Sequence, residues 1–155
     1  MLTYADLFTP NLFLITNHTV GGEVVLANEL MMRVLRTVLT AVQKQYPFRL
    51  VGYLFLPAAM RLLVEPADGV VLDQIMVAMH QQFQTDYQQV MGIPGTTLLW
   101  ERRYQTQRVT HVDDLALQLD ALHYEPVRHG LVDKPEAWPY SSYRSWVAHG
   151  LYPAP

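Results

Sequence analysis

Hydrophobic and polar positions are most regular in the segment RLVGYLFLPAAMRLLVEP at positions 49–66. Two apolar runs, 50–56 and 60–64, are separated by Pro57 and Ala58, a connection short enough for a hairpin. Each run is five to seven residues long and rich in Val, Leu, Phe and Tyr, which favours buried strands over helices. The segment therefore predicts two antiparallel strands, on which side chains two positions apart share a face.

Three other segments carry apolar residues at the three- and four-residue spacing of amphipathic helices: positions 28–47, 72–92 and 110–126. Asn28 is the expected cap of the first helix, and Gly92 is expected to end the second. Thr110 and Asp113 form a capping pair for the third helix, and Pro126 is expected to stop it.

Two further strands are predicted at 11–18 and, near a sheet edge, at 100–109. The resulting order predicts an α+β, ferredoxin-like βαββαβ fold: an antiparallel sheet covered by two helices, plus an additional C-terminal helix and an aromatic tail. We expect one domain over 1–155, with a core at about 11–131 and a C-terminal strap at about 132–155.

Composition narrows the class of protein. Half of the 155 residues are hydrophobic, and no apolar run approaches the roughly 20 residues of a membrane span. No signal peptide is apparent, so we expect a cytoplasmic protein without a membrane partner. The absence of cysteine excludes disulfides and thiolate chemistry. Eleven Lys and Arg residues against fourteen Asp and Glu give a net charge of −3, which argues against strong non-specific DNA affinity.

Several stretches resemble the REP-associated tyrosine transposases, which belong to the single-tyrosine HUH group. They are FRLVGYLFLP at 48–57, LLVEP at 62–66, WERRY at 100–104, HYEPVRHGLV at 123–132 and WPYSSYR at 138–144. The resemblance implies a domain that acts in DNA transposition by cutting single-stranded DNA next to hairpins. It also implies Mg²⁺ or Mn²⁺, held by a His-hydrophobic-His pair on a strand, and a helix-borne tyrosine that attacks the phosphate.

The decisive residues of that family are missing from this chain. Ala59 and Arg61 stand where the resemblance places the two metal-binding histidines, and Ala121 stands in the place of the nucleophilic tyrosine. A methyl group cannot ligate a metal, and a permanent guanidinium cation repels one. We therefore expect no metal cofactor and a catalytically inactive, transposase-like protein. Glu125, which replaces the Asn of the family's Asn-Pro-Val-Lys stretch, is expected to pair with Arg61 rather than hold an ion.

Four arginines are the candidate contacts for DNA phosphates, because family members carry basic residues there: Arg102, Arg103, Arg108 and Arg128. The alternative is ordinary solvated charge, balanced by acidic neighbours: Glu101, Asp113 and Asp114. Tyr124 is a weak candidate for a substitute nucleophile, and packing against the sheet is the favoured alternative. The aromatic residues between Trp138 and Trp146 are expected to pack in the core rather than to stack on bases. The six histidines form no metal-binding pair and are interpreted as surface or capping residues.

Two functions remain open from the sequence. The first is an inactive transposase-family protein that still recognises single-stranded or hairpin DNA. The second is a domesticated protein-interaction or scaffold domain without DNA binding, which the acidic balance favours. Residual nuclease activity through rebuilt ligands is a third and weaker alternative, and the chain is expected to be a monomer or a homodimer.

Overall fold

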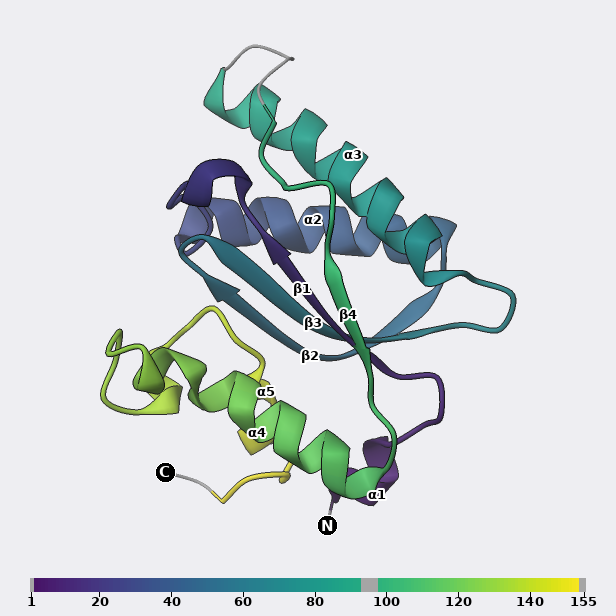
Figure 1. Ribbon diagram of the computed structural model, residues 1–155. Helices are drawn as coiled ribbons and strands as arrows, with labels where there is room; N and C mark the ends of the chain where they lie inside the picture. Colours follow the sequence, from purple (N-terminus) through teal and green to yellow (C-terminus); the bar gives the residue numbers. More distant parts are fainter. Residues whose placement is uncertain (1, 93–97, 154–155) are drawn as a thin grey trace.

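The computed structural model describes residues 2–92 and 98–153 and contains a four-stranded antiparallel sheet in the order β2-β3-β1-β4 (Figure 1). The strands are β1 (Phe13–His18), β2 (Phe48–Leu56), β3 (Ala59–Pro66) and β4 (Gln105–Arg108). β3 pairs with both β2 and β1, and β1 pairs with β4. This order confirms the predicted ferredoxin-like arrangement. β4 lies at an edge as expected but begins at Gln105, because Trp100 makes only an isolated bridge to Thr19.

Two long helices, α2 (Glu29–Gln45) and α3 (Leu72–Met91), cover one face of the sheet (Figure 1). The Asn28 side chain accepts a hydrogen bond from the Met31 amide at 2.9 Å, which confirms the predicted cap of α2. Gly92 ends α3 in the left-handed region, at φ 63°, where a glycine carries no steric penalty. Leu30 and Val90 belong to the predicted apolar stripes, but both are exposed because they lie at helix ends beyond the sheet.

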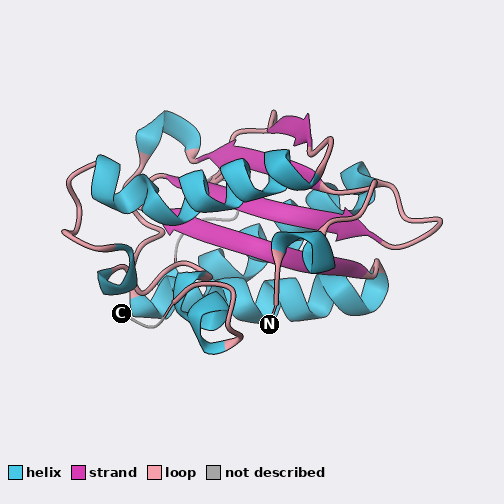
Figure 2. Cartoon of the chain, turned by 90° about the horizontal axis from the view of Figure 1, so that it is seen from below, coloured by secondary structure: helices cyan, strands magenta, loops and turns pink. Residues whose placement is uncertain are grey.

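A third helix, α4 (Val112–Arg128), lies on the opposite face, and Figure 2 shows it crossing the strands from that side. The short elements α1 (Tyr4–Leu7), η2 (Pro135–Ala137) and α5 (Tyr143–Ala148) gather around it, while η1 (Val20–Gly22) follows β1. Successive strand residues feed two separate cores: Leu62 packs under α2 and α3, and Leu63 packs under α4. Strands β1, β2 and β3 are thus buried on both faces, whereas the residues of β4 are exposed.

The boundaries of α4 differ from the prediction at both ends. The helix is capped by His111, whose Nδ1 accepts from the Asp114 amide at 3.1 Å, and Asp114, not Asp113, accepts from the Thr110 amide at 3.0 Å. Pro126 does not stop the helix, which continues to Arg128. The proline removes one hydrogen-bond donor but keeps a helical φ, so the chain completes its last turn before leaving the helix.

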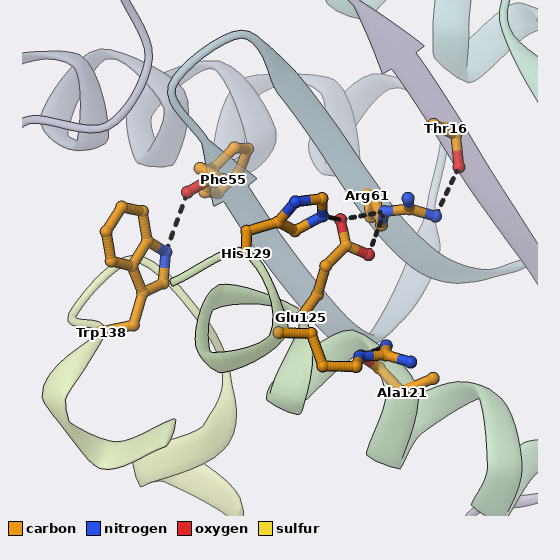
Figure 3. Close-up of polar contacts among 8 residues, drawn as sticks. Thr16, Phe55, Arg61, Ala121, Glu125, His129 and Trp138 are labelled. Atoms are coloured by element: carbon orange, nitrogen blue, oxygen red, sulfur yellow. Dashed lines mark hydrogen bonds and ion pairs between the residues drawn. The ribbon is translucent and has the colours of Figure 1, made fainter. Parts of the chain in front are cut away.

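The predicted strap after position 132 packs along β2, the other edge of the sheet. Phe55 donates its amide to the Tyr140 carbonyl at 2.8 Å, and Ser142 donates to the Tyr53 carbonyl at 3.0 Å. The indole of Trp138 donates to the Phe55 carbonyl at 3.0 Å (Figure 3). Trp138 is buried, which confirms its expected core packing. Positions 154–155 of the predicted strap lie outside the described residues. No helix in the described part of the chain is long and apolar enough to cross a membrane.

Candidate functional site

The candidate site lies on the face of the sheet that α4 covers. Strand pairing places Arg61 beside Thr16 of β1 on one side and Leu54 of β2 on the other, and it places Ala59 beside His18. Directly paired residues point to the same face of a sheet. Leu54 packs in the core under α4, so Arg61 and Ala59 also face α4. The two positions assigned to metal ligands by the family resemblance therefore share the face predicted for them.

Arg61 and Glu125 form an ion pair across the space between sheet and helix. The Nε atom of Arg61 lies 2.8 Å from Oε1 of Glu125 and donates to Oε2 at 3.1 Å (Figure 3). The Arg61 side chain is 31% exposed, and that of Glu125 is 9% exposed. The pairing expected from the sequence is confirmed. The guanidinium of Arg61 neutralises the largely buried carboxylate of Glu125. A buried carboxylate without such a partner would be costly in this core.

Helical geometry explains why Glu125 reaches the sheet. Ala121, Glu125 and His129 are spaced four residues apart and follow one stripe along the end of α4. His129 Nε2 lies 3.4 Å from Oε2 of Glu125, which places the carboxylate between the imidazole and the guanidinium. Ala121 contributes only a methyl group to this stripe, and Arg128 folds back to donate to the Ala121 carbonyl at 2.7 Å.

The chemistry of these side chains does not fit a divalent cation. Ala59 has no donor atom, the Arg61 guanidinium is a cation, and the carboxylate of Glu125 already accepts from Arg61. Among the described residues, no group of three or more histidines and acids is arranged to hold a metal ion.

Tyr124 does not pack against the sheet, so that expectation is wrong. It is 44% exposed, and its ring meets the ring of Tyr143 edge-on with centroids 6.3 Å apart. The reason is its position on α4: one residue before Glu125, it turns about 100° away from the stripe that faces the sheet. The Tyr124 hydroxyl is therefore not positioned to attack a phosphate held at Arg61.

The four arginines predicted to contact DNA do not converge on one point. Arg102 and Arg103 are exposed in the segment that precedes β4. Arg108 donates to the Pro10 carbonyl at 2.8 Å, and its guanidinium lies 4.9 Å from the centre of the Phe13 ring. Arg128 is held on α4. Within the described residues, no ion pair joins these four arginines to Glu101, Asp113 or Asp114.

One functional-looking cluster was missed. His123, expected at the surface or at a cap, is fully buried, and burial lowers its pKa to about 3. It contacts the Tyr152 hydroxyl through Nδ1 at 2.9 Å and the Ser142 hydroxyl through Nε2 at 2.7 Å. Tyr152 in turn donates to Asp120 at 2.8 Å. The signal was present in the sequence, because His123 continues the buried stripe of α4 four residues after Leu119. His111 does cap a helix, as expected for the histidines.

The polar chain around His123 ties the C-terminal strap to α4. Since Tyr152 donates to Asp120, its oxygen is left to accept from His123 Nδ1, and Nε2 then accepts from Ser142. Ser142 accepts from the Tyr53 amide at 3.0 Å, which extends the chain to β2. Every member has a partner, and the cluster fastens elements together beneath the surface.

Comparisons with known proteins place these features in context. No family model matches the chain. The REP-associated tyrosine transposase of Escherichia coli strain K12 is 24% identical over 121 residues, which cover 78% of this chain and 70% of that protein. A putative REP-associated tyrosine transposase of Haemophilus influenzae is 40% identical over 55 residues, 36% of this chain and 31% of that protein.

Two solved structures share the fold. A REP-associated tyrosine transposase bound to a REP hairpin superposes with a TM-score of 0.79 at 22% identity, covering 94% of this chain and 84% of that one. A putative transposase from Deinococcus radiodurans superposes with a TM-score of 0.53 at 17% identity, covering 69% of this chain and 85% of that one. The predicted resemblance is confirmed over most of the chain.

Proposed function

Because this chain resembles the REP-associated tyrosine transposases over most of its length, we propose that it is a member of that family which binds single-stranded DNA bearing a hairpin and does not cut it. The observation that carries the proposal is the ion pair between Arg61 and Glu125. It occupies the place where the family resemblance puts a metal ion, directly beside the position of the attacking tyrosine.

The loss of cleavage follows from the chemistry of the replaced groups. A covalent phosphotyrosine mechanism needs a nucleophilic oxygen and a Lewis acid on the scissile phosphate. Ala121 supplies no oxygen, and the guanidinium of Arg61 disfavours a divalent cation at its position. The chain therefore lacks both the nucleophilic oxygen and a site for the Lewis acid, and restoring one of them would leave the other missing.

Retention of DNA binding rests on different observations. The solved relative with a TM-score of 0.79 is bound to a REP hairpin, and the match covers 94% of this chain. The exposed Arg102 and Arg103 and the face around Arg61 offer guanidinium groups for phosphates. Electrostatic attraction from the whole molecule is weak at a net charge of −3, so we expect moderate affinity with strong salt dependence.

The second candidate is a protein-interaction domain that has lost DNA binding. The net charge of −3 favours it, because a phosphate backbone is repelled by an acidic surface at long range. The two candidates differ in one measurable property, the affinity for hairpin DNA at low salt.

The test is a titration of the full chain against a single-stranded oligonucleotide that carries one hairpin, with a scrambled-stem oligonucleotide as control. We expect micromolar or tighter binding to the hairpin, which weakens between about 50 and 200 mM salt. No binding at about 50 mM salt would overturn the DNA-binding function and leave the interaction domain. The same mixtures with Mn²⁺ should show no nicking; metal-dependent nicking would overturn the proposed inactivity.

A further inference from the structure

The guanidinium of Arg61 is only partly used by Glu125. Nε of Arg61 contacts both carboxylate oxygens, at 2.8 and 3.1 Å. Within the part of the chain that the structure describes, the group's other hydrogen bond runs from Nη1 to the Thr16 hydroxyl, at a long 3.5 Å. Figure 3 shows Arg61 between the carboxylate and Thr16. Since arginine carries five donors in a planar fork, the edge formed by its two terminal nitrogens remains open to a further acceptor.

The strand neighbours of this open edge carry amide, imidazole and hydroxyl side chains. Gln105 is paired with Thr16 across β1 and β4, so it extends the row that contains Arg61 on the same face. His18, paired with Ala59, lies in the next row. Gln105, His18 and the nearby His129 are exposed. We call Thr16, His18, Arg61, Gln105 and His129 the donor cluster.

Glu125 on α4 contacts this donor cluster, and its carboxylate is already paired with members of it. Its carboxylate sits between Arg61 and His129 and is 9% exposed, so it presents little charge to solvent. The Arg61 side chain is 31% exposed, which leaves part of its guanidinium in contact with water. Ala59, two residues before Arg61 on the same face of β3, contributes only a methyl group beside His18.

We propose that Arg61 binds a backbone phosphate of single-stranded DNA through its terminal nitrogens, at the position where relatives are expected to place a metal ion. The inference rests on the proposed function and deepens it. Two unesterified oxygens of a phosphodiester match the spacing of the arginine fork, and the pair of charge-assisted hydrogen bonds is strong. The cation that replaced the metal thus takes over its electrostatic role in binding, without its role in cleavage.

The test measures DNA affinity as a function of salt for Arg61→Gln and for a matched control, Arg49→Gln. Arg49 makes the same kind of contact, with Nε 2.8 Å from Oε1 of Glu65, at the far end of the hairpin. We expect Arg61→Gln to weaken binding about tenfold and to make the slope of log affinity against log salt shallower by about 0.7. Arg49→Gln, which removes the same charge, should change neither value.

Two more variants separate the effect of the paired guanidinium donors from the effect of the positive charge. Arg61→Lys keeps the cation beside Glu125 but lacks the paired donors, so we expect it to lose several-fold in affinity while keeping most of the salt slope. Glu125→Gln keeps an acceptor for Arg61 and removes a negative charge, so it should bind DNA more tightly. Arg61→Lys also carries the test if Arg61→Gln fails to fold, as judged by circular dichroism.

The outcomes are distinguishable from failure of the proposed function. If the wild-type chain does not bind hairpin DNA, the proposed function is wrong and this inference falls with it. If the wild-type chain binds, but Arg61→Gln or Arg61→Lys binds as tightly with the same salt slope, only the inference is overturned. Equal losses in Arg61→Gln and Arg49→Gln would also overturn it, since they would indicate a general charge effect.

Discussion

The carboxylate of Glu125 on α4 lies 2.8 Å from Nε of Arg61 on β3, although the two residues are 64 positions apart in the sequence. The contact joins the third helix to the central strand pair and closes the space between them. It also lies where the family resemblance predicts a metal ion, one helical turn from the position that it predicts for a nucleophile. We therefore expect this one ion pair to affect both the stability of the fold and the function.

Removing either partner should destabilise the fold, and Arg61 should matter more. Arg61→Gln leaves the Glu125 carboxylate, 9% exposed, without its cation, which we expect to lower the free energy of unfolding by about 2 kcal/mol. Glu125→Gln keeps an amide oxygen as acceptor for the more exposed arginine but removes the carboxylate charge, and should cost about 1 kcal/mol. Urea denaturation of the single and double variants gives the coupling energy. A coupling near zero would contradict a structural role for the pair.

Histidines placed back at the two strand positions should restore a metal site. Ala59→His together with Arg61→His puts two imidazoles on the face that already holds Glu125, so three ligands converge on one ion. We expect micromolar Mn²⁺ binding by calorimetry, and nicking of hairpin DNA once Ala121→Tyr is added. Ala59→His alone is the control and should bind Mn²⁺ at least tenfold more weakly, because Arg61 remains.

Acid should destabilise the protein through His123 well before the carboxylates are protonated. Burial lowers its pKa in the folded protein from the ordinary 6.5 to about 3, so the unfolded chain binds more protons between these values. The contribution is fully present above pH 6.5 and is lost as the pH falls toward 3. From pH 7 to 4.5 we expect a loss of about 2 kcal/mol.

The variant His123→Gln isolates this effect. Its unfolding free energy, measured by urea denaturation across the same pH range, should fall less steeply than that of the wild-type chain. Some slope should remain, because burial also lowers the pKa of His80. Parallel pH profiles for the two proteins would show that His123 is not buried in its neutral form.

The indole of Trp138 should be the stronger of two anchors that hold the strap to β2. Trp138→Phe removes the donor to the Phe55 carbonyl inside a buried site, which we expect to cost about 2 kcal/mol and several degrees in Tm. Trp146→Phe removes a similar bond to the Val51 carbonyl at 2.7 Å, but at a half-buried position, and should cost less. Equal thermal shifts would argue against burial as the deciding factor.

Local patterns predicted the secondary structure well where one residue decides the geometry. Asn28 caps a helix through its own side chain, and Gly92 ends one because it tolerates a positive φ. The prediction failed where two solutions were locally similar. Thr110 pairs with Asp114 instead of Asp113, and Pro126 is tolerated inside the last turn of α4, since the tertiary packing of Leu119 and Leu122 holds the helix in place.

Residue type and spacing alone specify the strand alternation and the helix stripes, because these patterns repeat every two or four positions. They also place Ala59, Arg61 and Ala121 at the positions that the family resemblance assigns to metal ligands and a nucleophile. The family resemblance also predicted the ion pair between Arg61 and Glu125. Only the tertiary structure decided that His123 is buried, that Tyr124 turns outward, and that the strap completes the edge of β2. Those outcomes depend on which distant segment fills the space beside each residue, and contacts between segments far apart are not encoded in any local period.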